Sequence, residues 1–416
     1  MSRRPRPPLR SPRWLGVGAV SLLLAGCESL PPPAPLPPVP AAMLASAHAR
    51  TNEEVYLQAW GLVREYYFDP AAVVGSPWTV ARNRHFQAAL ASVTETELYD
   101  AINSLMAELH DSHTAASTPQ QNREQRSEKK PRSGFQLERV ENRWVVKEVL
   151  PKSPAEEAGV KAGWIFVAEN NVPVGDHPRF ERVNGQAVHD SFLDAADRPV
   201  TVDMTTRILT TVPPPQERVL EGGVVYLRFD DFEPSSRRWL SDQLKQHREA
   251  PAVVIDLRQN PGGGLFSLGI SIGELFDHAV DIGTFIHRSG WQEEDKSKEI
   301  FSAHYAGKIA VLIGPLSASS SEIFASTLQH YGRATLVGRK SAGAVRGSFR
   351  FTLKDGGAVQ VSLMDYRALD GRTLEGAGVS PDVTVTTTLA DVRAGRDPDL
   401  QAALVRLKPV VAANTR

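Results

Sequence analysis

Four serines gather where an apolar run meets a predicted helix, in the stretch GPLSASSSEIF at residues 314–324. A serine at such a junction can cap the helix, or it can be a nucleophile among the unpaired N–H groups of the helix N-terminus. Ser319 is followed three residues later by Glu322, which is the spacing of a capping box. A nucleophile would also need a base and an oxyanion site from elsewhere in the chain. The residues alone leave both roles open.

A second junction, VVIDLRQNPGGGLF at residues 253–266, follows another apolar run. Its glycines, Gly262, Gly263 and Gly264, can bring backbone amides close to a substrate because no side chain blocks the approach. The stretch has neither the Gly-Lys-Ser/Thr ending nor the GxGxxG spacing of phosphate-binding loops. It therefore does not predict a nucleotide site.

The elements that must position these junctions alternate from Val219 onward between short apolar strands and helices. Strands are predicted in GGVVYLRFDDF, APAVVIDLRQNPGGG, KIAVLIG and RATLVGRK, and helices in SSRRWLSDQLKQH, SLGISIGELFDHA and SSSEIFASTLQHYG. Continuous apolar runs are typical of strands buried on both faces, so the sequence predicts an α/β layered core with a largely parallel sheet. In such a core, the loops after the strand ends carry the chemistry.

Helical periodicity dominates upstream, in NEEVYLQAWGLVREYYFD and ETELYDAINSLMAELHDSHT. We expect a small helical N-terminal domain there. The charged, apolar-poor run TPQQNREQRSEKKPRS that follows predicts an exposed or flexible connection.

Between this connection and the core, SGFQLERVENRWVVKEVLPKSPAEEAGVKAGWIFVAENN alternates apolar and polar residues around a helix that begins near Pro154. Together with VNGQAV, the stretch resembles a PDZ domain, although Trp164 stands where aspartate is usual and VPVGDHPRFER is inserted. The resemblance implies that a peptide adds a strand beside the Gly-Phe loop, with Gly134 and Phe135 capturing its carboxylate. A purely structural module is the alternative.

The N-terminus has the layout of a secretory signal, because five arginines precede the apolar stretch WLGVGAVSLLLAG. LAGC ends in Cys27, which is the only cysteine, and resembles a bacterial lipobox. The resemblance implies a lipidated Cys27 followed by the proline-rich spacer PPPAPLPPVP. Because Glu28 rather than aspartate follows, we expect attachment to the outer membrane, facing the periplasm. An ordinary cleaved signal is the alternative.

Taken in order, LHDSHT, the PDZ-like unit, YLRFDDF, IDLRQNPGGG, SASSSEIFASTLQHYGRATLVG and LEGAGVSPDVTV resemble the S41 serine peptidases, which include carboxy-terminal processing proteases and the tricorn protease core. The resemblance implies a ClpP/crotonase-like fold. It selects Ser319 as the nucleophile, with the Ser320 amide and the Gly263/Gly264 loop as the oxyanion site.

The base differs from that of the best-known branch of the family. Processing proteases use a Ser/Lys dyad, but LVGRKSAGAV puts Ala344 at the lysine position, and Lys340 lies four residues earlier. The tricorn-like branch uses histidine and glutamate, for which His113 in DSHT and Glu375 in LEGAGVSPD are the counterparts. Ser112 would assist His113. Such a set is chemically complete, because histidine takes the hydroxyl proton and the carboxylate orients the imidazole.

Each of these residues also has a bland interpretation. His113 can cap a helix end, and Glu375 can be an exposed turn carboxylate. His110, Asp111 and His113 match no compact zinc motif, so we expect no metal and no cofactor.

The chain has 416 residues, a formal net charge of −1 and a pI near 6.9, which give no electrostatic case for nucleic acid. We expect a signal peptide (1–26), a lipidated cysteine with its linker (27–50), a helical domain (51–118), a charged linker (119–132), a PDZ-like domain (133–212) and a catalytic core (213–416). The expected activity is a membrane-anchored serine endopeptidase acting on peptides or proteins of the envelope. The alternatives are a Ser/Lys enzyme using Lys340 and a non-catalytic peptide-binding lipoprotein.

Overall fold

The computed structural model of the protein describes residues 33–41, 48–125, 129–175, 182–210, 212–298 and 304–408. The signal-like segment and Cys27 lie outside these residues. Within them, no helix is both long and apolar enough to cross a bilayer.

The core is built on a six-stranded sheet in the order β10-β11-β12-β15-β16-β19. Five of these strands, β11, β12, β15, β16 and β19, run parallel to one another, and β10 is antiparallel to β11. The strand bounds are β10 Gln216–Val219, β11 Val225–Arg228, β12 Ala252–Asp256, β15 Lys308–Ile313, β16 Thr335–Gly338 and β19 Val383–Thr384. Every residue of β12 is buried, as its uninterrupted apolar run predicts.

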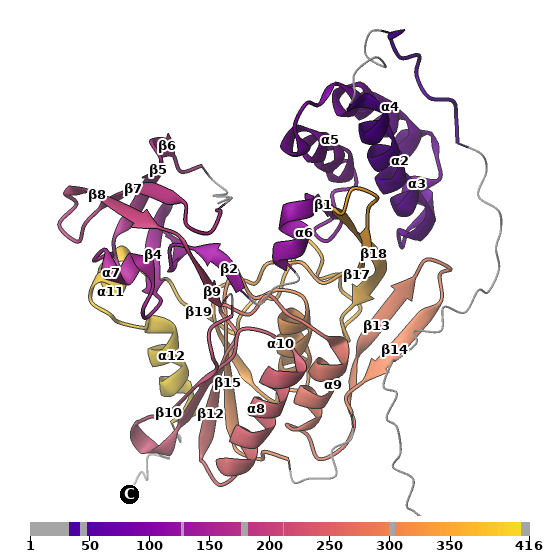
Figure 1. Ribbon diagram of the computed structural model, residues 1–416. Coiled ribbons are helices and arrows are strands. Elements are labelled where there is room, and N and C mark those ends of the chain that lie inside the picture. Colours follow the sequence, from indigo (N-terminus) through magenta and orange to yellow (C-terminus); the bar gives the residue numbers. More distant parts are fainter. Residues whose placement is uncertain are drawn as a thin grey trace, which may run out of the picture.

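Helices cover both faces of this sheet (Figure 1). One face packs against α8 (Pro234–Gln246), α9 (Leu265–Gly273) and α10 (Ser320–His330), and the opposite face packs against α12 (Pro398–Leu407). Alternate strand residues divide between the two faces, so Val253 and Ile255 join the larger cluster while Val254 joins the smaller one. The predicted α/β layered core is confirmed, and its strands and helices fall in the expected stretches.

The N-terminal helices pack on a second sheet. They are α2 (Ala49–Tyr66), α3 (Pro70–Val73), α4 (Ser76–Ala91) and α5 (Glu95–Ala107). The sheet has the order β1-β18-β13-β14, with β17 also pairing with β18. Its strands are β1 (Ala115–Ser117), β13 (Asp281–His287), β14 (Gln292–Lys296), β17 (Gly347–Thr352) and β18 (Ala358–Arg367). One cluster joins the helices to Leu353, Val359 and Val361, so the helical unit is held by the C-terminal half of the chain.

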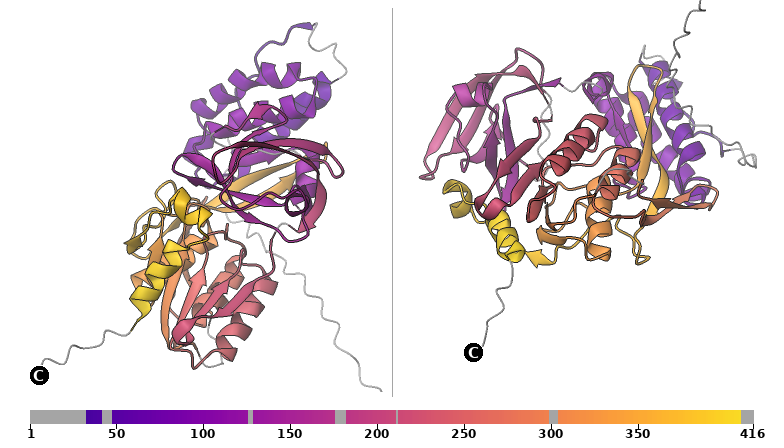
Figure 2. Two further views of the ribbon diagram at one scale, coloured as in Figure 1. Left: turned by 90° about the vertical axis from the view of Figure 1, so that its left-hand side faces the viewer. Right: turned by 90° about the horizontal axis from the view of Figure 1, so that it is seen from below.

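A β-rich unit occupies the position of the predicted PDZ-like domain. Its sheet has the order β3-β4-β5-β7-β8, with β6 pairing with β5. The elements are β3 (Phe135–Val140), β4 (Arg143–Val149), α7 (Pro154–Glu157), β5 (Ile165–Glu169), β6 (Val172–Pro173), β7 (Ala187–Leu193) and β8 (Pro199–Thr205). A late helix, α11 (Leu389–Arg393), packs Leu389 and Val392 against Val145 and Ile165 of this unit. The helical and β-rich units lie at the same end of the core, as the views in Figures 1 and 2 agree.

The charged run predicted as an exposed connection is structured where it is described. It forms α6 (Pro119–Gln125) and β2 (Lys129–Arg132), and β2 pairs with β9 (Arg207–Thr210). The Asn122 side chain donates to the Gly356 carbonyl at 2.9 Å, which holds α6 against the second sheet. The sequence did not predict this secondary structure, because the partners that stabilise it lie far away in the sequence.

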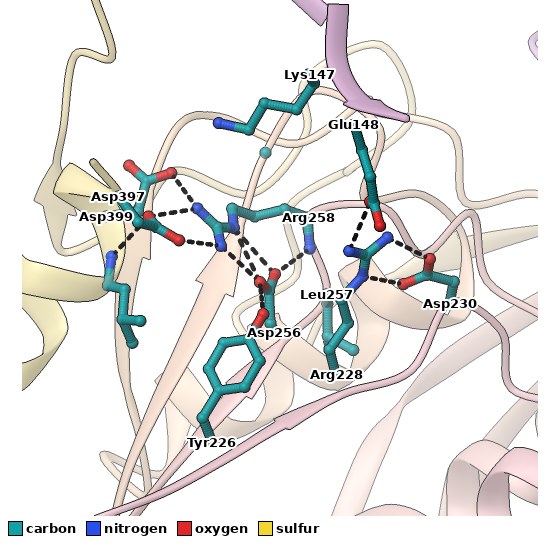
Figure 3. Close-up of polar contacts among 12 residues, drawn as sticks. Lys147, Glu148, Tyr226, Arg228, Asp230, Asp256, Leu257, Arg258, Asp397 and Asp399 are labelled. Atoms are coloured by element: carbon teal, nitrogen blue, oxygen red, sulfur yellow. Dashed lines mark hydrogen bonds and ion pairs between the residues drawn. The ribbon is translucent and has the colours of Figure 1, made fainter. Parts of the chain in front are cut away.

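A buried ionic cluster fixes the start of the glycine loop (Figure 3). The Arg258 guanidinium lies 2.6 Å from Asp256, 2.8 Å from Asp397 and 3.0 Å from Asp399, and the Tyr226 hydroxyl donates to Asp256 at 2.7 Å. Desolvation on burial raises the pKa of Asp256, but Arg258 outweighs it and holds that pKa at about 2. The cluster ties β12 to the N-terminus of α12.

A neighbouring ionic cluster joins the β-rich unit to the core. Arg228 of β11 pairs with Asp230 at 2.8 Å and reaches Glu148 of β4 at 2.9 Å (Figure 3). Arg339, which follows β16, pairs with Glu138 of β3. Side chains of β3 and β4 therefore fix the β-rich unit to the loop end of the parallel sheet.

Candidate active site

Only one of the four serines at the β15–α10 junction has an exposed surface. The other three are buried, and each donates its hydroxyl proton to a main-chain carbonyl of segment 257–263. They are Ser317, which donates to Leu257, Ser320, which donates to Gly263, and Ser321, which donates to Asn260. Ser319 is partly exposed. The buried serines therefore hold the glycine loop, and Ser319 is the one left accessible.

Ser319 adopts an unfavourable backbone conformation at the N-cap of α10. Its φ of 53° and ψ of −121° lie outside the favoured regions for a residue with a side chain, at a cost of roughly 1–3 kcal/mol. Its N–H donates to the Ala344 carbonyl at 2.7 Å and to the Glu322 carboxylate at 3.1 Å. These contacts hold the strained residue at the tip of the turn.

Glu322 fastens the 341–344 segment to the start of α10. Its carboxylate, which is fully buried, accepts from the Ser341 hydroxyl at 2.6 Å and from the N–H groups of Gly343 at 2.7 Å and Ala344 at 2.8 Å. Burial raises the pKa of Glu322, and these hydrogen bonds oppose the rise. The capping-box glutamate therefore also positions the segment beside Ser319.

The glycine loop passes directly against Ser319. A Cβ on Gly262, whose φ is +105°, would lie 2.7 Å from the Ser319 Cβ, so only glycine fits. The Gly264 N–H donates to the Phe232 carbonyl at 3.2 Å. Among the described residues, the N–H groups of Gly263 and Ser320 have no hydrogen-bond acceptor. Of the two glycine N–H groups predicted for the oxyanion site, that of Gly263 is therefore available and that of Gly264 is not.

His113 lies in the loop after α5 and is half-buried. Its ring Nδ1 is 2.8 Å from the Ser112 hydroxyl, and its backbone N–H donates to the Asp111 carboxylate at 3.0 Å. Burial lowers the pKa of His113, while the carboxylates of Glu375 and Asp111 raise it in opposition. Because Nδ1 already has a partner, Nε2 is the ring nitrogen left for a reacting group.

Glu375 joins the histidine loop to the 344–345 segment. Its carboxylate accepts the Ser112 N–H at 3.2 Å and the Val345 N–H at 2.9 Å. The Glu375 and Asp111 carboxylates and the His113 ring each present an atom within 4.8 Å of the others. A chain of contacts, which defines this locus, links the three predicted residues: Ser319 bonds to Ala344, the adjacent Val345 bonds to Glu375, and Glu375 bonds to Ser112 next to His113. The Ser319 hydroxyl and the His113 ring are not hydrogen-bonded to each other.

Arg346, which our sequence interpretation did not single out, is the cation at this locus. Its guanidinium is 3.2 Å from Asp111, 3.5 Å from Asp365 and 4.0 Å from Glu375, and it lies 4.7 Å from the Phe68 ring. Asp111 and Glu375, with His113, are close enough together to be candidate metal ligands. The Arg346 guanidinium lies beside both carboxylates and balances their negative charge. Only its place two residues after Ala344 could have drawn attention to it, because its partners come from distant segments.

The other candidate residues lie around this locus in different environments. Ala344 stands beside Ser319, whereas Lys340 is exposed just after β16. Gly134 is buried, and a Cβ there would lie 2.1 Å from the Ser153 Cβ. The Phe135 ring packs on Phe166 with ring centroids 5.6 Å apart.

A cleft of about 1150 Å³ extends from the β-rich unit toward this locus, and its lining includes neighbours of Ser319 and His113 but not Ser319, His113 or Glu375 themselves. It is lined by α5, α6, β2 and the start of β3, and also by Pro261 and Leu316 of the two loops around Ser319 and by Asp111 and Thr114 beside His113. Within the described residues, β3 pairs only with β4, so its other edge can accept an added strand at the cleft. An extended peptide could lie there.

Comparison with known proteins identifies the family of this chain. Residues 223–385 match the model of peptidase family S41. A carboxyl-terminal-processing protease of Synechocystis is 30% identical over 388 residues, covering 88% of this chain and 90% of the relative.

Two solved structures share the fold. The photosystem II D1 C-terminal processing protease has a TM-score of 0.57 at 22% identity, covering 86% of this chain and 97% of the other. The tricorn protease has a TM-score of 0.54 at 19% identity, covering 87% of this chain and 37% of the other. With its α/β core, its serine-headed helix and a relative matched over nearly its whole length, the chain belongs to peptidase family S41 and is a serine-type peptidase.

Proposed function

We propose that this peptidase is an endopeptidase that cleaves proteins or peptides of the bacterial cell envelope through a Ser319/His113/Glu375 acyl-enzyme mechanism. The observation that supports the proposal is the chain of contacts from the partly exposed Ser319 through segment 344–345 and Glu375 to Ser112, beside the half-buried His113. The absence of a lysine at position 344 supports histidine as the base.

The reaction runs in two halves. The Ser319 Oγ attacks the scissile carbonyl carbon while His113 Nε2 takes the hydroxyl proton. The tetrahedral intermediate then collapses, the C–N bond breaks, and His113 returns the proton to the leaving amine. Water activated by His113 hydrolyses the acyl-enzyme and releases the acid. Because catalytic hydrogen bonds are often long without substrate, we expect the Ser319–His113 contact to tighten on binding.

The oxyanion site uses the N–H groups of Gly263 and Ser320. Both lack an acceptor among the described residues, whereas the Gly264 N–H already donates to Phe232. The Ser320 amide also lies at the positive end of α10, which favours the developing negative charge. We therefore assign the loop's contribution to Gly263 rather than Gly264.

Ser112 and Glu375 orient the His113 ring, and Glu375 also stabilises its charged form. Ser112 holds Nδ1 at 2.8 Å, and the Glu375 carboxylate accepts the Ser112 N–H at 3.2 Å, so the acid positions the serine that positions the ring. The carboxylate also stabilises the imidazolium formed in the transition state.

Peptidase assays on four proteins test the proposal. We expect wild-type protein to cleave an unfolded protein substrate, Ser319→Ala to have no activity, and His113→Ala to lose at least about 10³-fold. Lys340→Ala should match wild type, because Lys340 is exposed. Loss of activity in Lys340→Ala with His113→Ala unaffected would replace this mechanism by a Ser/Lys dyad. Well-folded wild-type protein with no activity would indicate a binding protein.

We further propose that Cys27 is lipidated and attaches the enzyme to the outer membrane, facing the periplasm. LAGC after the apolar stretch supports this, as does the proline-rich spacer behind it. Cys27→Ser should move the protein from the outer-membrane fraction to the soluble periplasmic fraction and abolish palmitate labelling. Unchanged fractionation would contradict the proposal.

We also propose that the β-rich unit is a PDZ-like domain that captures peptides along β3. The unpaired edge of β3 at the cleft supports strand addition. Gly134 contributes the positive φ of +96° that turns the chain into β3.

A further inference from the structure

Two cations face the cleft from β2. Lys130 and Arg132 both line it, and both are half-buried. Being two residues apart on a strand, they project from the same face at a spacing of roughly 7 Å. In the antiparallel pair, Lys130 lies opposite Leu209 and Arg132 opposite Arg207. The strand pairing therefore fixes both cations at the cleft wall.

Neither cation has an ion-pair partner among the described residues. Burial lowers the pKa of Lys130, and the neighbouring Arg132 lowers it further. Burial lowers the pKa of Arg132, and Arg182 adds to the effect. Partly desolvated like charges destabilise a fold unless a partner of opposite charge compensates them.

Two of the four carboxylates that line the cleft are engaged by cations outside it. Asp111 is paired with Arg346 and Asp230 with Arg228. Asp100 also lines the cleft, and Glu124 is the carboxylate whose charge raises the pKa of Lys130. Arg350, a further cation, acts on Lys130 in the opposite sense to Glu124. Glu124, which also lines the cleft, therefore compensates Lys130 in part, whereas no carboxylate is among the groups that shift the pKa of Arg132.

We propose that this cleft selects acidic peptide segments, whose carboxylates at alternate positions pair with Lys130 and Arg132. An extended peptide added beside β3 repeats its side chains every two residues, at the same spacing of roughly 7 Å as the two cations. The cleft continues to Pro261 and Leu316, which belong to the two loops around Ser319. The acidic segment would therefore lie close to the peptide bond that is cleaved. This inference rests on the proposed peptidase function and names its substrate class.

Matched peptides test the preference. One peptide carries glutamates at two alternate positions, and its partner carries glutamines there. Binding is measured by fluorescence anisotropy on the Ser319→Ala protein, so that it does not depend on turnover. We expect the glutamate peptide to bind at least about tenfold more tightly, since hydrogen bonds to charged groups contribute more than neutral ones. Added salt should reduce the difference.

Charge reversal supplies the variant test. Lys130→Glu with Arg132→Glu should invert the preference toward a lysine peptide, and the milder Lys130→Gln with Arg132→Gln should abolish it. Arg207→Gln is the control, because Arg207 pairs with Glu157 at 2.8 Å and does not line the cleft. Thermal unfolding establishes that each variant is folded.

The outcomes separate this inference from the proposed function. Equal binding of both peptides by the Ser319→Ala protein would overturn the inference while leaving peptidase activity intact. Tight, charge-dependent binding without cleavage by wild-type protein would sustain the acidic preference and overturn the proposed mechanism.

Discussion

Replacing Glu375 with glutamine removes one negative charge beside the candidate base and keeps the shape of the side chain. The variant can still accept the Ser112 N–H, whereas its amide nitrogen cannot accept from Val345. Glu375 and the His113 ring present atoms within 4.8 Å of each other. At an effective dielectric constant of about 20, that distance corresponds to about 3.5 kcal/mol between the carboxylate and an imidazolium.

This energy sets the expected loss of activity. The full 3.5 kcal/mol would lower kcat/KM by about 300-fold, because about 1.4 kcal/mol corresponds to a factor of ten. Arg346, 4.0 Å from the same carboxylate, already offsets part of that charge. We therefore expect a decrease of about 10²-fold in the plateau of kcat/KM.

The pH profile distinguishes this electrostatic role from a structural one. The Glu375 carboxylate raises the pKa of His113 against the lowering caused by burial, so its removal lowers that pKa. The acid limb is the part of the pH profile in which kcat/KM falls because His113 becomes protonated. It should then move to lower pH. Kinetics from pH 4 to 9 on a peptide substrate measure both effects.

The control is Glu156→Gln, which also removes a carboxylate that accepts a backbone N–H, from Lys152 at 2.6 Å. It should leave the plateau and the acid limb unchanged. A Glu375→Gln plateau within twofold of wild type, or an acid limb displaced to higher pH, would refute the reasoning.

Three further perturbations test the surroundings of the site. Arg346→Gln removes a cation that lowers the pKa of His113, so the acid limb of kcat/KM should move to higher pH. The control is Arg367→Gln, because Arg367 pairs with Asp365 at 2.6 Å and does not act on the pKa of His113; this variant should leave the acid limb in place. Gly262→Ala places a Cβ 2.7 Å from that of Ser319 and should cost about 10²-fold in the rate of fluorophosphonate labelling, whereas Gly371→Ala, also at positive φ but with no atom within 4 Å of its Cβ, should label normally. Asp256→Asn leaves Arg258 without its nearest carboxylate and should lower the free energy of unfolding by about 3 kcal/mol in urea titrations. Because the folded-state pKa of Asp256 is about 2, the stability that its charge contributes is present above about pH 4 and is lost as the pH falls toward 2. The free energy of unfolding of Asp256→Asn should therefore fall less steeply with decreasing pH than that of wild type. Equal slopes in the two proteins would contradict this account.

The sequence was most informative where burial imposes an unbroken pattern. Strands such as β12 and β15 lie buried on both faces, so their apolar runs predict them directly. Serine and glutamate at capping-box spacing located the N-terminus of α10, because that signal is local. The second sheet escaped prediction, since its β17–β18 pairing and its contact with the N-terminal helices depend on distant partners.

The site shows the same division. Which serine is exposed follows from three buried hydroxyls that bond to loop 257–263, and no spacing within SASSSE contains that information. The part played by Arg346 depends on Asp111, Asp365 and Glu375, which lie in three separate segments. Similarly, the engagement of the Gly264 N–H by Phe232 appears only once the loop packs against its neighbour.

The most direct test of the central claim is to map where a covalent acyl-enzyme analogue forms. Wild-type protein is treated with a fluorophosphonate at pH 7.5, digested and examined by peptide mass spectrometry, in parallel with His113→Ala. We predict one adduct, on Ser319, formed at least about 10²-fold more slowly in His113→Ala. An adduct on a different serine, or equal labelling rates in the two proteins, would contradict the claim that His113 activates Ser319.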